Sequence, residues 1–243
     1  MVTVSTGLAV GLAVLVALLA ALGTTVGLGA AGWGVGLTGG FVINAAVARG
    51  GAGGLGPADL VTGTRAAIAC ALAALVADSF FQQPAVSTLV ALTFAALVLD
   101  ALDGWVARRT RTASMFGARF DGEIDAFLIL VLSVYVADTV AGWVLAIGVA
   151  RYVFAVACWG LPWLRRQLPP RYWRKVVAAT QGIVLTLAAA SLAPRWLTYA
   201  ALAVALALLT ESFGRDMLWL WRHRFAEGAQ LTGPSGPLRV QRP

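Results

Sequence analysis

Long apolar stretches recur along the chain from residue 5 to residue 213. A helix needs ~20 predominantly apolar residues to cross the hydrocarbon core of a bilayer. Eight segments approach that length, at 5–23, 27–48, 58–77, 86–106, 120–138, 141–160, 176–193 and 196–213. Each has to be helical, because a backbone exposed to lipid must satisfy its own hydrogen bonds. The pattern predicts an all-α fold, a polytopic membrane helix bundle.

The composition excludes several classes of function. Hydrophobic residues make up 60% of the chain and charged residues only 12%, which is too apolar for a soluble domain. The net charge is +7, but the basic residues lie between apolar runs rather than along one polar face. This pattern favours contact with anionic membrane lipids. It is not the pattern of a nucleic-acid-binding protein, so no nucleic-acid partner is expected. Cys70 and Cys158 lie inside apolar runs, and the single histidine, His223, lies in a polar tail, so neither residue type suggests a catalytic or metal site.

Lysine and arginine residues are distributed unevenly over the loops. If the N-terminus lies inside, nearly all of the 18 basic residues fall in loops on that side, and Arg195 alone falls on the other. Cytoplasmic loops carry such an excess, so the loop between the fourth and fifth segments is predicted to be cytoplasmic. Lys175 is the only lysine, and this arginine bias favours a GC-rich bacterial source. We therefore expect a multi-pass protein of a bacterial cytoplasmic membrane.

The chain divides into three predicted parts. A Gly-rich linker, GGAGGLGP at 50–57, separates the first two segments from the rest. The first segment lacks the positively charged start of a signal peptide and is interpreted as a retained helix. The predicted parts are a two-helix membrane extension at 1–50, a membrane core at 51–213 and a disordered cytoplasmic tail at 214–243.

Four aspartates flank the loop between the fourth and fifth segments, in the stretch DALDGWVARRTRTASMFGARFDGEID. Asp100 and Asp103 are three residues apart, and Asp121 and Asp125 are four apart, so each pair shares one helix face. The two helices are expected to be antiparallel neighbours, which brings all four carboxylates together near the cytoplasmic surface. Hard oxygen ligands of this kind suit Mg²⁺ or Mn²⁺. A pair of such ions clamps a pyrophosphate and stabilises the charge on its leaving group.

Small and polar residues accompany the aspartates. Gly104 and Gly117 remove side chains where a ligand would approach the backbone, and Ala107 is small on the face of Asp103. Arg108 is a counter-ion for the carboxylates, and Ser114 offers a hydroxyl in the loop. Glu123 points away from the face that Asp121 and Asp125 share, and is interpreted as solvated.

This stretch resembles the CDP-alcohol phosphotransferase family. The family pattern D-x2-D-G-x2-A-R-x8-G-x3-D-x3-D is matched at all its fixed positions, and PADLVTGTR at 57–65 resembles the entry to the first core helix. The resemblance implies a six-helix core formed by the third to eighth segments, a CDP-activated donor, an alcohol or phosphorylated alcohol as acceptor, and a homodimer. CDP-diacylglycerol and a soluble CDP-alcohol both fit as donor, with the lipid preferred. The N-terminal helix pair has no counterpart in the common core.

The resemblance also implies roles for individual residues. Metal ions, two in number, would be held by Asp100, Asp103, Asp121 and Asp125. Asp125 would also be the general base that takes the proton of the acceptor hydroxyl. The CDP site would be lined by Gly104, Ala107, Arg108, Ser114 and Gly117.

Other polar residues within the segments leave alternatives open. Arg151, in the middle of the sixth segment, either binds an acceptor phosphate or pairs with a motif aspartate. Arg65 is interpreted as extending its guanidinium to the membrane surface, and Lys175 as a candidate to reach the cavity. Gln181 and Glu211 are predicted to form interhelical hydrogen bonds. A divalent-cation transporter and an inactive scaffold are the alternatives to a transferase, although the concentration of acidic residues at one surface argues against a carrier.

Overall fold

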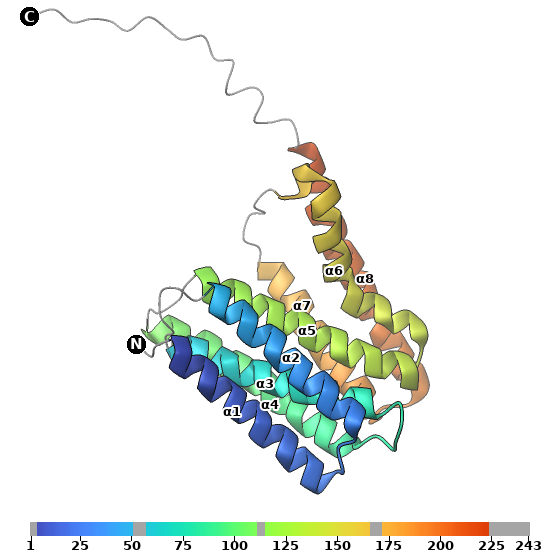
Figure 1. Ribbon diagram of the computed structural model, residues 1–243. Coiled ribbons are helices and arrows are strands. Elements are labelled where there is room, and N and C mark those ends of the chain that lie inside the picture. The colour runs from blue at the N-terminus through green and yellow to red at the C-terminus, as the bar shows by residue number, and fades with distance from the viewer. Residues whose placement is uncertain (1–3, 51–56, 111–114, 166–171, 224–243) are drawn as a thin grey trace, which may run out of the picture.

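The computed structural model describes residues 4–50, 57–110, 115–165 and 172–223, and it is almost entirely helical over these ranges. Successive helices run up and down a single bundle, from which the ends of α6 and α8 rise (Figure 1). In chain order the elements are α1 (Val4–Thr25), α2 (Ala30–Gly50), α3 (Pro57–Asp78), α4 (Val86–Thr110), α5 (Met115–Thr139), the 3₁₀ helix η1 (Gly142–Val144), α6 (Leu145–Gly160), the 3₁₀ helix η2 (Pro162–Arg165), α7 (Tyr172–Ala189) and α8 (Arg195–Arg222).

Each of the eight predicted membrane segments corresponds to one α-helix, so the predicted all-α membrane bundle is confirmed. Among the described residues, five helices are long and apolar enough to cross a bilayer, namely α1, α2, α3, α6 together with η1, and α8. α4 contributes a shorter apolar stretch, Val86–Leu102. The chain is therefore an integral membrane protein with several apolar helices.

α8 is longer than predicted. It continues past residue 213 to Arg222, so the first residues of the predicted disordered tail at 214–243 are helical. Packing explains the extension, because the ring centroid of Trp221 lies 5.7 Å from that of Trp163 in η2 and Leu220 is completely buried. Residues 224–243 lie outside the described part of the chain.

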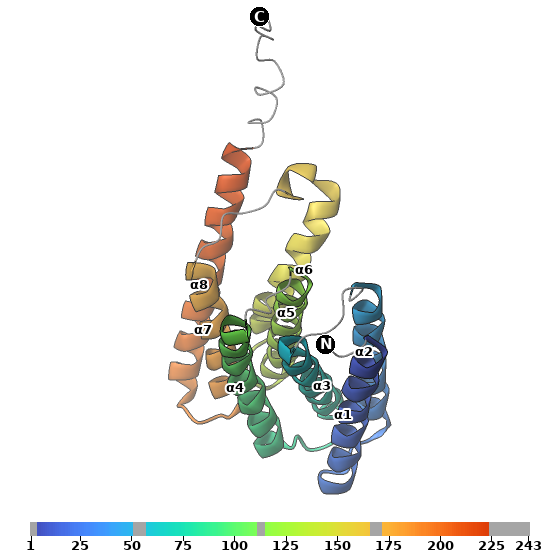
Figure 2. The ribbon, with the colours of Figure 1, turned by 90° about the vertical axis from the view of Figure 1, so that its left-hand side faces the viewer.

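α3 is the central helix of the bundle. It packs against α1, α2, α4 and α5, and Figure 2 shows it with the α1–α2 pair on one side and α4 on the other. From Ala66 to Leu75 its residues are alanines with a few larger apolar side chains, and every one of them is buried. Small side chains allow neighbouring helices to approach closely without lipid between them.

Glycines in α2 permit the close approach of α1 and α3. A Cβ atom placed on Gly36 would lie 2.8 Å from the side chain of Leu19 and 3.3 Å from that of Ala74. One placed on Gly32 would lie 3.0 Å from the backbone oxygen of Ala74. The absence of side chains at these positions therefore fixes how tightly the N-terminal pair seats on α3.

The far end of α3 holds the start of α2. The buried carboxylate of Asp78 accepts hydrogen bonds from the backbone N–H groups of Gly29, at 2.5 Å, and Gly32, at 3.1 Å. N–H groups in the first turn of a helix have no partner within that helix, so a carboxylate placed there acts as a cap. Asp78 supplies this cap from a different helix, and it thereby joins the N-terminal pair to the core.

The other half of the bundle is formed by α5, α6, α7 and α8. α5 and α6 touch closely at Gly148, where a Cβ atom would lie 2.8 Å from the Cα of Leu130. Gln181 on α7 donates from Nε2 to the backbone oxygen of Ala205 on α8 at 2.8 Å, so its predicted interhelical hydrogen bond is confirmed. Tyr199 on α8 donates to the backbone oxygen of Val140 at 2.9 Å. These contacts hold together the helices that line the second of the cavities described next.

Candidate active site

Three of the four predicted aspartates converge. Asp100 comes from α4, while Asp121 and Asp125 lie one turn apart on the same face of α5. One carboxylate oxygen from each residue lies within 4.8 Å of those from the other two. A cluster of oxygen ligands this close has the composition that a hard divalent cation prefers.

The aspartates meet across α3 rather than through direct packing of their own helices. α4 and α5 each pack extensively on α3, and among the described residues they make little contact with each other. The expectation that α4 and α5 are direct neighbours is therefore wrong, although their carboxylates do come together. The helix between them supplies the residue that occupies the centre of the cluster.

That residue is Arg65. Its side chain is only 1% exposed, and its Nη2 lies 3.1 Å from Oδ1 of Asp100. Nη1 also contacts Asp121, and Nη2 contacts Asp125. The planar guanidinium presents several donors in a fixed fork, so a single arginine can bridge three carboxylates. The prediction that Arg65 extends to the membrane surface is wrong, because these carboxylates hold it in the interior.

A cavity of about 450 Å³ opens beside the cluster. α7 forms its opposite wall through Lys175, Ala178 and Gly182, and Leu97 contributes an apolar surface from α4. Lys175 does reach this cavity, where it adds a second positive charge near the aspartates. The site therefore has an acidic floor, a basic group at its rim and partly apolar sides.

A second cavity, of about 340 Å³, lies on the other side of Asp125. Asp125 lines both cavities, and so does Ala178. The second cavity is also lined by Arg151 from α6, Arg174 and Gln181 from α7, and Ser212 and Asp216 from α8. One carboxylate is thus shared between a cavity that contains the acidic cluster and a cavity that contains two guanidinium groups.

Both arginines of the second cavity have acidic partners. Arg151 forms an ion pair with Glu123 at 2.5 Å, and Arg174 forms one with Asp216 at 3.5 Å. Among the residues whose side chains the structure describes, the acidic partner of Arg151 is therefore a carboxylate outside the motif. The side chain of Glu123 is 60% exposed, as its predicted solvation requires, but its ion pair with Arg151 was not predicted.

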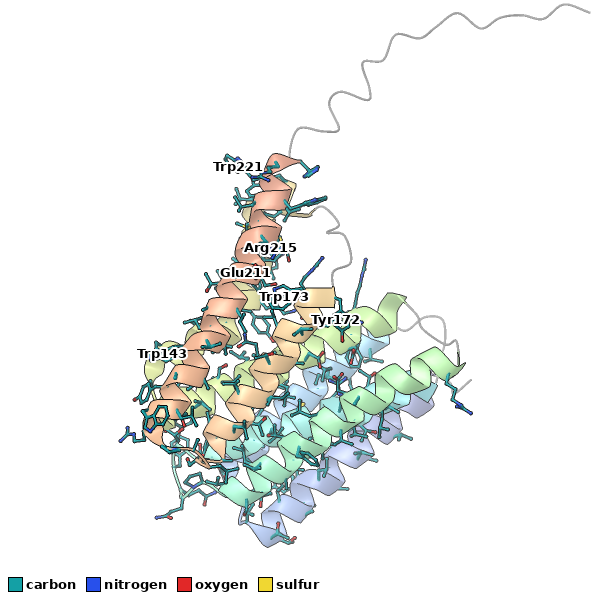
Figure 3. The ribbon with its side chains drawn as sticks, turned by 180° about the vertical axis from the view of Figure 1, so that it is seen from behind. Trp143, Tyr172, Trp173, Glu211, Arg215 and Trp221 are labelled. Atoms are coloured by element: carbon teal, nitrogen blue, oxygen red, sulfur yellow. The ribbon has the colours of Figure 1, made fainter. Side chains whose placement is uncertain are left out.

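Trp173 on α7 lies near Glu211 and Arg215 on α8 (Figure 3), and polar contacts join the two helices there. The indole N–H of Trp173 donates to Oε2 of Glu211 at 2.9 Å, and Arg215 donates to Oε1 at 2.8 Å. The predicted interhelical hydrogen bond of Glu211 is therefore confirmed. The bond from Trp173 joins the start of α7 to the middle of α8, and both helices line the second cavity.

The remaining motif residues are described less completely. Gly117 lies at the start of α5, one turn before Asp121. Ser114 lies outside the described residues. The structure describes the helical backbone of α4, but not the side chains, at Asp103, Gly104, Ala107 and Arg108.

Comparison with known proteins identifies the family. The model of the CDP-alcohol phosphatidyltransferase family matches residues 56–209. The chain belongs to this family. As a CDP-alcohol phosphatidyltransferase it is an enzyme of phospholipid biosynthesis that transfers a phosphate group from a CDP-alcohol to an alcohol. The match begins just before α3, so α1 and α2 lie outside it. No curated protein and no solved structure matches the chain.

Proposed function

We propose that this enzyme transfers the phosphatidyl group of CDP-diacylglycerol to a hydroxyl group of a small phosphorylated alcohol, with release of CMP. The observation that carries the proposal is the position of Asp125, which lies in the wall of both cavities. One cavity has the carboxylates that a metal-bound pyrophosphate requires, and the other has the guanidinium groups that an acceptor phosphate requires. A group that bridges the two is placed to act on both substrates.

The donor set supports a metal site. Asp100, Asp121 and Asp125 offer only oxygen ligands, within a short distance of one another, and such ligands fit Mg²⁺ or Mn²⁺. Three carboxylates leave the remaining coordination positions to water or to the phosphates of the substrate. Asp103 would complete the set, and two ions are proposed. When bound, such ions supply electrostatic stabilisation of the pyrophosphate and of the departing CMP. Arg65 would orient the carboxylates, since its fork contacts all three.

Asp125 is proposed as the general base. Its carboxylate takes the proton from the acceptor hydroxyl, and the acceptor oxygen forms a bond to the β-phosphorus of the donor. The bond between that phosphorus and the oxygen bridging to the α-phosphorus breaks, and CMP leaves with both electrons of that bond. A general base must lie within hydrogen-bond reach of the proton it removes. Among the aspartates of the cluster, Asp125 is the one that also lines the second cavity.

The CDP moiety is proposed to bind at the cytoplasmic end of α4 and the start of α5, against Gly104, Ala107, Arg108, Ser114 and Gly117. Glycine and alanine allow a nucleotide to approach the backbone, and arginine pairs with its phosphates. The apolar residues Leu97 and Leu128 beside the cluster suit a donor whose remaining part stays in the lipid. Cytoplasmic orientation of this site, a bacterial membrane and a homodimer stay predictions.

The acceptor is proposed to carry a phosphate because Arg151 and Arg174 both line the second cavity. An intramembrane arginine is costly unless it has a function or a partner. Glu123 and Asp216 are the partners observed, and an acceptor phosphate would compete with them for the guanidinium groups. We call this second cavity the acceptor cavity. Its volume of about 340 Å³ is near the lower end of the ~300–1,000 Å³ range for small-molecule sites, which favours a compact acceptor.

The test uses the purified enzyme in lipid nanodiscs with CDP-diacylglycerol and a panel of acceptors, namely glycerol 3-phosphate, inositol 1-phosphate and serine. Products are identified by mass spectrometry, and CMP release is measured with EDTA and again after Mg²⁺ or Mn²⁺ is added. We expect turnover with a phosphorylated acceptor, loss of turnover with EDTA and recovery with metal. Turnover with serine alone would remove the phosphate assignment, and CMP release unaffected by excess EDTA would remove the metal site.

A further inference from the structure

One residue that lines the acceptor cavity carries a buried polar atom that the proposed reaction does not use. Gln181 on α7 lines the cavity, and its side chain is 1% exposed. Its Oε1 is buried and has no hydrogen-bond partner among the described residues. Buried carbonyl oxygens nearly always accept a hydrogen bond, so an unpaired one beside a cavity points to a ligand group that donates.

The orientation of the Gln181 amide is fixed by its other contact. Nε2 lies 2.8 Å from the backbone oxygen of Ala205, which can only accept a hydrogen bond. The amide nitrogen must therefore face α8. A flipped amide would place two acceptors against each other, so the unpaired group is the oxygen.

We propose that Gln181 determines acceptor specificity by accepting a hydrogen bond from a hydroxyl group of the acceptor other than the one that reacts. This inference rests on the proposed function, because it assumes that the acceptor occupies this cavity. The guanidinium groups of Arg151 and Arg174 in the same cavity favour an anionic acceptor, and a neutral hydroxyl donor fits beside them. The substrate class is a small polyol phosphate.

The physical basis of the selectivity is the cost of leaving Oε1 unpaired. A site built to hydrogen-bond a substrate hydroxyl rejects an analogue that lacks it, because the buried partner then has nothing to bind. Gln181 does not touch the reacting atoms in this assignment, so it affects the choice and affinity of the acceptor more than the chemical step.

The test compares acceptor pairs that differ in hydroxyl content. The pairs are glycerol 3-phosphate with 3-hydroxypropyl phosphate, and inositol 1-phosphate with 2-hydroxycyclohexyl phosphate. Each is assayed by CMP release with wild type and with Gln181→Met, which keeps the length of the side chain and removes the acceptor oxygen. We expect wild type to prefer the more hydroxylated member of the substrate pair by about 10-fold or more in kcat/KM. Gln181→Met should reduce that ratio to near one, chiefly through KM.

Two further variants separate recognition from folding. Ser133→Ala removes another buried oxygen that has no hydrogen-bond partner among the described residues, at the contact of α5 with α6, and should keep the wild-type ratio. Gln181→Glu, whose carboxyl burial keeps protonated, retains an acceptor oxygen and an O–H that donates to the backbone oxygen of Ala205, so it should keep the hydroxyl preference. If Gln181→Met does not fold, a loss of preference in Gln181→Glu overturns the proposal.

The outcomes distinguish this inference from the function on which it rests. No CMP release with any acceptor would remove the proposed function and the inference with it. CMP release with an unchanged preference in Gln181→Met, or with no preference in wild type, would overturn the inference and leave the transferase intact.

Discussion

Replacing Arg65 with methionine removes the cation on which Asp100, Asp121 and Asp125 converge. Methionine has a similar length and suits the apolar surroundings of α3, so the change mainly removes charge and hydrogen bonds. The three carboxylates then repel one another without the guanidinium between them. In the absence of divalent metal we expect the variant to be less stable than wild type.

The magnitude follows from how deeply each partner is buried. Removing one partner of a fully buried ion pair costs about 3–5 kcal/mol, and an exposed pair contributes about 0–1 kcal/mol. Arg65 is 1% exposed, but the carboxylates of Asp100, Asp121 and Asp125 are 46%, 35% and 38% exposed, so water can solvate them in part. An intermediate loss of about 2 kcal/mol is expected, which corresponds to a fall in Tm of about 4–8 °C for a chain of this size.

The assay is thermal unfolding followed by intrinsic fluorescence in detergent, with EDTA or with Mg²⁺. Because a divalent ion takes over neutralisation of the carboxylates, Mg²⁺ should raise the Tm of Arg65→Met more than that of wild type. Arg215→Met is the matched control, since it breaks an exposed pair with Glu211 and should leave the Tm unchanged. Equal Tm values for wild type and Arg65→Met in EDTA would refute the reasoning, and so would equal stabilisation by Mg²⁺.

Three further outcomes are expected. Asp125→Asn should lower turnover by about 10²–10⁴-fold and retain more donor affinity than Asp121→Asn in calorimetry; near-normal turnover with normal donor binding contradicts the base assignment. Asp78→Ala removes the cap on α2, which stabilises the helix by about 1–2 kcal/mol. Hydrogen exchange of the backbone amides at 29–32 should therefore accelerate by about 10-fold, while the rate of CMP release stays at the wild-type value. An unchanged exchange rate contradicts the cap. A cysteine introduced at Thr112, which lies outside the described residues, should react in a Cys158→Ser background with an impermeant reagent only after the cells are opened; labelling of intact cells reverses the predicted orientation.

The aspartate cluster could be predicted because its geometry is local. Asp121 and Asp125 are four residues apart, and any α-helix places such residues on one face. The depth of Asp100 follows from its distance to the end of its apolar segment. Neither argument says what lies between the two helices, and this is why Arg65 was missed. Its position eight residues after Pro57 places it at a comparable depth, and that was the available signal.

The partners of Glu123 and Asp78 also could not be predicted. Glu123 was placed correctly away from the cluster face, but its partner Arg151 lies on another helix, and sequence spacing does not specify the rotation of α6 against α5. Asp78 ends an apolar segment, where a solvated carboxylate is the ordinary expectation. Its hydrogen bonds to the first turn of α2 depend on how the N-terminal pair packs, which no local pattern determines.

The N-terminal pair has a consequence for membrane insertion. α1 and α2 run in opposite directions along α3, so the pair returns the chain to the face of the membrane from which it set out (Figure 1). An even number of crossings leaves the orientation of everything that follows unchanged, whereas a single added helix would invert it. A unit of this kind can be gained or lost as a whole while the aspartates stay on the same face. Removal of the pair would expose the alanine-rich surface of α3 to lipid. Lipid is an apolar solvent, and that surface needs no new hydrogen bonds there because the backbone of a helix already satisfies its own.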